Sequence, residues 1–283
     1  MAGEIMEALN LKSSGVYVDA TLGLGGHSEM ILQGAAGCTL IGIDRDDEAL
    51  ESSARRLEHY ENVHLVKGRF SGVRELVNGI GYERVDGIVM DIGVSTLHLK
   101  SEERGFSFKS DAPLDMRMDR TQELTAADIV NRYPEKELAD IIFNYGEERF
   151  SRRIARAIVY SRKKCQIRYC SELSDIIYKS IKNRGKIHPA TRTFQALRIE
   201  VNRELEELSS AIESGAAILA PDARLCILSY HSLEDRIVKN AFRKLAAEGV
   251  FRIITKKPMV PERDEQRSNP SSRSAKLRIG EKI

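Results

Sequence analysis

The first residues that could do chemistry form a glycine-rich turn near the start of the chain. Gly23, Gly25 and Gly26 directly follow an apolar, β-branched run, and Asp44 ends the next such run. Glycines let backbone N–H groups approach a ligand closely, and a carboxylate about 20 residues further on can accept hydrogen bonds from ribose hydroxyls. The combination predicts a site for an adenosine-type cofactor at the start of a helix.

The order of the glycines favours one class of cofactor. A dinucleotide site would have the pattern Gly-x-Gly-x-x-Gly, but counting from Gly23 puts Ser28 at the third glycine. The chain contains no Gly-x-x-x-x-Gly-Lys-Ser/Thr loop, which argues against a nucleotide-hydrolysing motor. The turn therefore favours a methyl donor over a nicotinamide. A purely structural turn is the alternative, because many turns need residues that tolerate a positive φ.

The segments that must position this turn alternate between strand-like and helical patterns. Helical patterns begin near Gly26 and Asp46, each after an apolar run. Such alternation predicts a parallel sheet flanked by helices. A polar stretch from Lys256 to Ser274 is interpreted as a long loop between the last two strands. The strands are expected at residues 16–21, 38–44, 63–67, 85–91, 224–230, 251–255 and 275–279.

One long interval between strands predicts an inserted domain. About 130 residues separate Asp91 from the strand at 224–230, although a crossover connection needs only a dozen or more. The interval is helical in pattern, and one apolar stripe after Pro189 predicts a single long helix that leads back to the sheet. The expected domains are residues 1–102 with 206–283, which bind the cofactor, and residues 103–205, which recognise the substrate.

The charge of the chain is unevenly distributed. The total is +2, but residues 147–203 contain 15 Lys or Arg against 5 Asp or Glu, a net +10, so the remainder carries −8. Positive charge gathered in one region suits a polyanion, because each neutralised phosphate releases counterions. A solvated helical surface is the alternative.

Several classes of protein are disfavoured. The apolar runs are far shorter than the roughly 18 residues of a membrane span, and the first residues carry Glu4 and Glu7 rather than a basic leader. The four cysteines have no Cys-x-x-Cys spacing, so we expect free thiols and no metal site. The sequence therefore predicts a cytoplasmic protein that does not enter a membrane.

Short motifs with chemical side chains are spread over nearly the whole chain. They are Gly25-Gly26-His27, Asp44-Arg-Asp46, Asp91-Ile-Gly-Val-Ser95, Glu103-Arg-Gly-Phe-Ser-Phe108, Pro113-Leu-Asp-Met-Arg-Met-Asp119, Tyr145-Gly-Glu-Glu-Arg-Phe150, His188-Pro-Ala-Thr-Arg-Thr-Phe-Gln195 and Ser229-Tyr-His-Ser-Leu-Glu-Asp-Arg236. Together they resemble the RsmH (MraW) family, which methylates the N4 amine of a decoding-centre cytidine in 16S ribosomal RNA. The resemblance implies a Rossmann-like class I sheet that binds S-adenosylmethionine, with an inserted helical domain.

The resemblance also implies roles for individual residues. Asp44 would bind the ribose and Phe70 would lie near the adenine, although Phe70 could equally be a plain core residue. His98 stands where Gln is common in the family, and either side chain can form hydrogen bonds. The implied cofactor-binding residues are Gly25, Gly26, His27, Asp44, Phe70, Asp91 and His98.

Methyl transfer from a sulfonium is a direct in-line displacement, so the enzyme mainly aligns the reacting groups. A cytosine amine is a poor nucleophile, and an acceptor for its proton should help. Asp91, at the end of the fourth expected strand, is the first candidate, although Asp91-Ile-Gly-Val replaces the Asp-Pro-Pro-Tyr motif of many amino-group methyltransferases. Asp115 and His231 are the next candidates. Asp115 could instead be a cap or ion-pair partner, and His231 a structural histidine.

The basic insert is expected to bind small-subunit ribosomal RNA, within an assembled or nearly assembled subunit, and a homodimer is possible. A DNA or protein methyltransferase, a catalytically silent RNA-binding assembly factor and, more distantly, a dehydrogenase are the alternatives. As an alternative for individual residues, some arginines of the insert would pair with nearby acidic residues and would not bind RNA. The candidate RNA-binding residues are Arg149, Arg152, Arg153, Arg156, Arg192 and Arg198.

Overall fold

The structure is a computed structural model that describes residues 1–95, 97–98, 101, 103–181 and 187–283. The chain divides into two compact units. The first unit consists of Met1–Gly93 and Leu205–Ile283, and the second of Val94–Glu204. The boundaries lie at 93/94 and 204/205, where the sequence led us to expect 102/103 and 205/206. Residue 102 lies outside the described residues.

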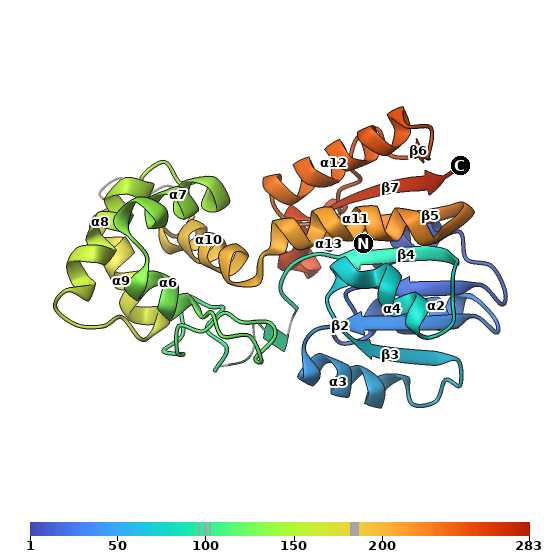
Figure 1. The fold of residues 1–283 in the computed structure, drawn as a ribbon, viewed down its shortest axis with the longest axis horizontal. Coiled ribbons are helices and arrows are strands. Elements are labelled where there is room, and N and C mark those ends of the chain that lie inside the picture. The colour runs from blue at the N-terminus through green and yellow to red at the C-terminus, as the bar shows by residue number, and fades with distance from the viewer. Residues whose placement is uncertain (96, 99–100, 102, 182–186) are drawn as a thin grey trace. The chain divides into compact units, whose positions relative to one another are not determined.

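The first unit is built on a seven-stranded sheet in the order β3-β2-β1-β4-β5-β7-β6 (Figure 1). Its first five strands are parallel, and β7 runs antiparallel between β5 and β6. All seven expected strands are present, so the predicted α/β class with a mainly parallel sheet is confirmed. The strands are β1 (Val16–Asp19), β2 (Thr39–Asp44), β3 (Val63–Lys67), β4 (Val85–Asp91), β5 (Leu219–Ser229), β6 (Phe251–Ile253) and β7 (Lys276–Lys282).

Helices accompany the strands of this sheet. The predicted loop at 256–274 is wrong in part, because it contains a short helix and a 3₁₀ turn. Local hydrogen bonds stabilise both: Gln266 Nε2 donates to the Pro261 carbonyl, and Ser272 Oγ donates to the Asn269 carbonyl. The helices are α1 (Ala2–Leu9), α2 (Gly26–Gly34), α3 (Asp47–Leu57), η1 (Phe70–Gly72), α4 (Val73–Gly79), α11 (Glu204–Ile218), α12 (Ser232–Ala247), α13 (Arg263–Ser268) and η2 (Pro270–Ser274).

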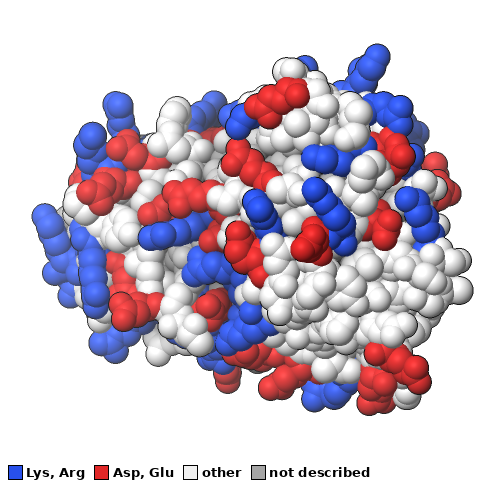
Figure 2. Space-filling model, turned by 45° about the vertical axis from the view of Figure 1, so that its right-hand side comes forward, with Lys and Arg blue, Asp and Glu red and all other residues white. Residues whose placement is uncertain are grey.

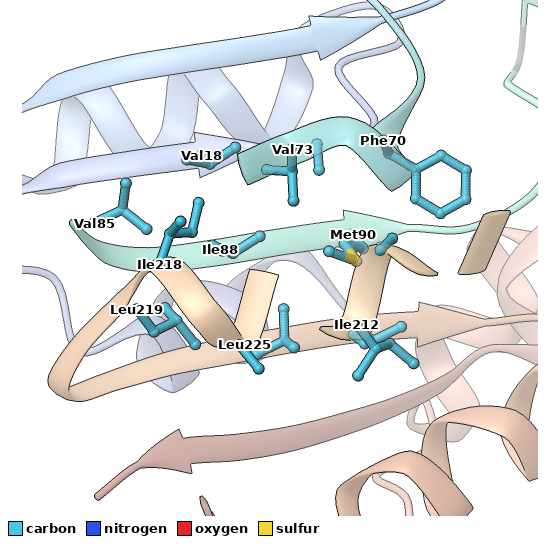
Figure 3. Close-up of a cluster of buried hydrophobic side chains, with 14 of the residues drawn as sticks. Val18, Phe70, Val73, Val85, Ile88, Met90, Ile212, Ile218, Leu219 and Leu225 are labelled. Carbon is cyan, nitrogen blue, oxygen red and sulfur yellow. The ribbon is translucent and has the colours of Figure 1, made fainter. Parts of the chain in front are cut away.

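Two apolar clusters pack on opposite faces of the sheet. Val18 and Ile88 belong to one cluster, whereas their chain neighbours Tyr17 and Val89 belong to the other. Successive side chains of a strand point to opposite faces, so this alternation is the signature of a sheet buried on both sides. Figure 3 shows the first cluster between the sheet and α11.

The second unit is helical and has its own apolar core. Its helices surround buried side chains such as Ile129, Ile142, Ile158 and Leu173. The helices are α6 (Ala126–Arg132), α7 (Glu135–Gly146), α8 (Ser151–Arg162), α9 (Cys170–Ser180) and α10 (Ala190–Asn202). No helix in the described ranges of either unit is both long and apolar enough to cross a bilayer.

The prediction of a single long helix after Pro189 is wrong. The helix is interrupted at Arg203, which adopts a left-handed φ of 50°. Next to it, Asn202 donates to the Met116 carbonyl and accepts from the Met118 N–H, at 2.8 and 2.9 Å. The apolar stripe is continuous in sequence, but its first half packs in the core of the second unit and its second half in the first unit.

Candidate active site

The glycine turn lies between β1 and α2 and has a fixed shape. Gly23 and Gly25 adopt positive φ angles of 51° and 73°, a conformation that glycine tolerates without strain. A Cβ on Gly25 would lie 3.3 Å from Ser53 Oγ, which itself donates a 2.8 Å hydrogen bond to the Gly23 carbonyl. No side chain in the described residues caps α2 where it begins at Gly26. The N–H groups of its first turn therefore suit a negatively charged ligand.

Asp44 is held at the carboxyl end of β2 by two backbone groups. One carboxylate oxygen accepts from the Gly23 N–H at 2.8 Å, and the other accepts from the Asp46 N–H at 2.9 Å. Each oxygen of a carboxylate has a further lone pair, so the group can still accept hydrogen bonds from hydroxyls. Asp44 thus fixes the glycine turn and presents an acceptor beside it.

Asp91 ends β4, the strand that pairs with β1. Its Oδ1 accepts a 2.8 Å hydrogen bond from the Tyr230 hydroxyl, and its backbone N–H donates to Thr21 Oγ1 at 2.6 Å. Its Oδ2 lies 3.9 Å from Nδ1 of His27, and its side chain is 28% exposed. The structure therefore brings Asp91 and His27 together beside the glycine turn, as the sequence led us to expect.

The surroundings of Asp91 make it a better proton acceptor than an ordinary carboxylate. Burial raises the pKa of Asp91, and this effect outweighs the lowering by the nearby His27 and by the hydrogen bond from Tyr230. Burial and the neighbouring Asp91 also raise the pKa of the Tyr230 hydroxyl, which stays protonated as a donor. An ionised Asp91 beside a fixed donor can take up a proton from a reacting amine.

Asp19, Thr21 and Tyr230 stand within or beside the sequence motifs, but the sequence predicted no role for any of them. Asp19 is buried and accepts from Ser28 Oγ at 2.8 Å and from the Thr21 N–H at 3.3 Å. Burial raises the pKa of Asp19, against the lowering by His27 and Ser28. The available signal was position, since all three residues stand at the carboxyl end of an expected strand, where ligands gather in open sheets.

His231 is the N-cap of α12 in the first unit. Its Nδ1 accepts from the Glu234 N–H at 3.4 Å, and its Nε2 lies 2.9 Å from Glu234 Oε1, although without hydrogen-bond geometry. The other Glu234 oxygen accepts from the N–H groups of Tyr230 and His231, at 2.7 and 3.2 Å. Both ring nitrogens of His231 thus face Glu234, which fits the alternative that His231 is a structural histidine. Its catalytic role stays a prediction.

Phe70 begins η1 directly after β3 and is 8% exposed. It belongs to the apolar cluster on one face of the sheet. In Figure 3 it lies at the end of that cluster near Met90, the residue before the last of β4. The structure therefore gives Phe70 a place in the core, and its contact with the adenine stays a prediction.

Asp115 lies in the second unit and forms a two-pronged ion pair. Arg117 Nε and Nη2 donate to its two oxygens at 2.7 and 2.8 Å, and the Arg117 N–H adds a third bond at 3.0 Å. Burial alone would raise the pKa of Asp115, but the hydrogen bonds and charge of Arg117 outweigh it and hold the pKa below its usual range. A carboxylate stabilised in its ionised form is a weak proton acceptor, so these contacts favour the ion-pair alternative for Asp115.

His98 also belongs to the second unit. It is buried, its Nδ1 accepts from the Ser95 N–H at 3.2 Å, and its ring stacks on Phe106 with 4.9 Å between ring centroids. These contacts orient the imidazole. Its role at the cofactor stays a prediction.

The six candidate arginines divide into exposed and structural groups. Arg198 forms a two-pronged pair with the buried Glu204 at 2.8 Å and is only 16% exposed, so it is poorly placed for RNA. Arg192 is 45% exposed but also has structural partners, since it donates to the Glu147 carbonyl at 3.2 Å and lies 3.7 Å from the buried Glu148 carboxylate. The other four, Arg149, Arg152, Arg153 and Arg156, are exposed on or just before α8.

Comparison with known proteins identifies the family. The sequence profile described as the MraW methylase family matches residues 1–283. This chain belongs to the MraW methylase family. It is therefore a methyltransferase, and S-adenosylmethionine is its methyl donor.

Similar proteins agree with this assignment. The ribosomal RNA small subunit methyltransferase H of Sulfurihydrogenibium sp. (strain YO3AOP1) is 48% identical over 284 residues, which cover 99% of this chain and 97% of the relative. The protein of the same name from Persephonella marina is 50% identical over 94% of this chain and 92% of its own length. The crystal structure of a putative rRNA-methylase from Clostridium thermocellum has a TM-score of 0.50 at 11% identity, covers 99% of this chain and 96% of that one, and shows the shared fold.

The residues of the first unit fit this cofactor. The N–H groups at the start of α2 suit its carboxylate, and the two oxygens of Asp44 suit its ribose hydroxyls. Gly25 leaves the turn open where a side chain would meet Ser53. When bound, the cofactor supplies a methyl group activated by a positively charged sulfur.

Proposed function

We propose that this methyltransferase acts on 16S ribosomal RNA and methylates the N4 amine of a cytidine in the decoding centre. The similar proteins are named ribosomal RNA small subunit methyltransferases, and the relationship extends over almost their whole length. The observation that carries the chemical part is Asp91, a partly buried carboxylate with a raised pKa at the carboxyl end of β4.

Asp91 would orient the amine and accept its proton. The lone pair of a cytosine amine is delocalised into the ring, so an acceptor on the N–H favours its use as a nucleophile. The Tyr230 hydroxyl and the Thr21 side chain fix Asp91 from two sides, at 2.8 and 2.6 Å. Such fixed groups cost no reorganisation during the reaction, and alignment of this kind contributes roughly 7 to 11 kcal/mol.

The second unit would recognise the RNA. Exposed arginines before and along α8 can neutralise phosphates, whereas the paired Arg198 helps to hold the end of α10. The target base has to leave its stack to reach the methyl donor, and unpaired RNA is the usual place where bases are read. The helical unit would thus have a task, RNA recognition, that goes beyond binding the methyl donor.

The test is transfer of labelled methyl from S-adenosylmethionine to small ribosomal subunits that lack the modification, followed by nucleoside analysis. The variant is Asp91→Asn, which keeps the size of the side chain and removes its basicity. We expect label in N4-methylcytidine, and a rate about 10²- to 10⁴-fold lower in the variant, the usual contribution of a general base. The matched control is Asp264→Asn, since Asp264 on α13 is 93% exposed.

The outcomes separate the parts of the proposal. Label in another nucleoside would leave a methyltransferase but overturn the cytidine assignment. No label, with cofactor binding intact by titration, would favour the RNA-binding assembly factor. An unchanged rate in Asp91→Asn would overturn the role of this carboxylate.

A further inference from the structure

A run of 21 residues in the second unit contains basic side chains and no acidic ones. Residues 149–169 have no Asp or Glu. Arg162 donates to the Val130 carbonyl at 2.7 Å and is partly buried. The remaining seven cations are exposed, and they are Arg149, Arg152, Arg153, Arg156, Lys163, Lys164 and Arg168.

Most of these cations share one face of α8, which we call the α8 face. If the helical spacing of about 100° per residue is extended through the turn at Lys163 and Lys164 that follows α8, the exposed side chains from Arg152 onwards fall within a sector of about 120°. Ile154 and Ile158 lie on the opposite side and are fully buried. The members of the α8 face are Arg152, Arg153, Arg156, Tyr160, Lys163 and Lys164.

Tyr160 stands in the middle of this sector and is the one uncharged member. Its side chain is 62% exposed, although an aromatic ring gains free energy from burial. Lys164 lies over the ring, with Nζ 4.6 Å from its centroid. An aromatic ring between cations can bind a nucleotide in two ways, because the base can stack on the ring and the phosphate can pair with the cations.

Little in the described part of the chain competes for these cations. The acidic group paired with the α8 face there is Glu135, whose carboxylate lies 3.7 Å from Arg156 Nε, and both side chains are well exposed. Figure 2 shows Lys and Arg side chains gathered at the left-hand end of that view. Exposed pairs of this kind are weak, so the charge remains available to a polyanion.

We propose that the α8 face binds a single-stranded segment of RNA, with an unpaired base stacked on Tyr160 and its neighbouring phosphates on the surrounding cations. The inference deepens the proposed function and rests on it for the choice of RNA. A duplex would use the cations but offer no free base to the ring. An acidic protein surface would likewise use the charge without needing the aromatic ring.

The test is the affinity of the full chain for a labelled single-stranded RNA of about 12 nucleotides and for a duplex of the same length, measured by fluorescence anisotropy. Tyr160→Ala should weaken single-strand binding about 5- to 100-fold and leave duplex binding and the salt dependence unchanged. Tyr160→Phe should bind like the unaltered protein. The control is Phe143→Ala on α7, which removes another exposed ring, 57% exposed, from the same unit.

Three results would overturn the inference. They are equal single-strand binding by Tyr160→Ala and the unaltered protein, an equal loss in Phe143→Ala, and an equal loss on the duplex. Methyl transfer to small subunits by Tyr160→Ala keeps this test apart from that of the proposed function. A raised KM with kcat retained fits loss of RNA binding. If N4-methylcytidine forms but RNA binding does not depend on Tyr160, the inference alone is overturned. If RNA binding depends on Tyr160 but no N4-methylcytidine forms, the proposed function alone is overturned.

Discussion

The charged groups at the ends of β2 and β4 are held differently from those on α8. At the sheet edge, which we define by Gly23, Asp44 and Asp91, each carboxylate accepts hydrogen bonds of 2.8 to 2.9 Å from fixed partners. On the α8 face, Arg156 is 79% exposed and lies 3.7 Å from the carboxylate of its partner Glu135. Hydrogen bonds thus fix the few carboxylates of the sheet edge, whereas the many cations of the α8 face are exposed and weakly paired.

The difference matches two different tasks. Aligning a methyl group with a nucleophile requires groups that do not move, and their contribution depends on position. Binding a polyanion requires net charge, and each exposed cation contributes a small and similar share. A single substitution should therefore have a large effect at the sheet edge and a small effect on the α8 face.

The largest effect after Asp91→Asn is expected from Asp44→Ala. The change removes the acceptor for the ribose and leaves the Gly23 N–H without its partner, so the turn loses its shape. Hydrogen bonds to charged groups contribute about 1.5–3 kcal/mol, and we expect cofactor affinity to fall about 10- to 100-fold or more by titration calorimetry. Asp47→Ala is the control, since Asp47 is 62% exposed and pairs with Lys67. Equal affinities of the two variants would remove Asp44 from the cofactor site.

A smaller and pH-dependent effect is expected from Tyr230→Phe. Asp91 must be ionised to accept a proton, so methyl transfer should fall as the pH drops through its raised pKa. The Tyr230 hydroxyl lowers that pKa by stabilising the ionised form, so its removal raises the pKa further. The acid limb of kcat/KM should therefore move to higher pH, with a modest loss at neutral pH. Tyr82→Phe, from a ring packed on the core, is the control. An unmoved acid limb would mean that another group limits the rate.

Much of the fold could be predicted because its signals are local. Apolar runs with turn residues at their ends located all seven strands, and the interval after Asp91 revealed the helical insert. The break at Arg203 could not be predicted, because the apolar stripe of α10 and α11 is continuous in sequence. It depends on Asn202, whose partners Met116 and Met118 lie more than 80 residues earlier. Such tertiary contacts override a helical pattern.

The residues of the candidate site could be proposed from the sequence, but their contacts with one another could not. Gly25, Asp44 and Asp91 stand out by type and by place at the ends of strands. The contact between Tyr230 and Asp91 joins residues 139 positions apart, and it is one of the interactions that set the pKa of the carboxylate. Asp115 and His231 were chosen for their chemistry, and the sequence did not show that their partners are Arg117 and Glu234. Residue type suggests what a side chain could do, whereas its partners determine whether the group remains available.

The smallest effect is expected from a single cation of the α8 face. Arg152→Gln keeps a long polar side chain and removes one charge. Each phosphate contact to a single strand adds about 0.7 to the slope of log affinity against log salt, so this slope should decrease by about that amount. At physiological salt the affinity for single-stranded RNA should fall only about two- to fivefold. Lys136→Gln on α7, where Lys136 is 91% exposed, is the control. Because exposed cations act through net charge, Arg153→Gln should cause a loss of similar size. A loss of RNA affinity in either variant as large as the loss of cofactor affinity in Asp44→Ala would contradict the comparison. It would mean that the substituted arginine is held in one position as closely as the sheet-edge carboxylates.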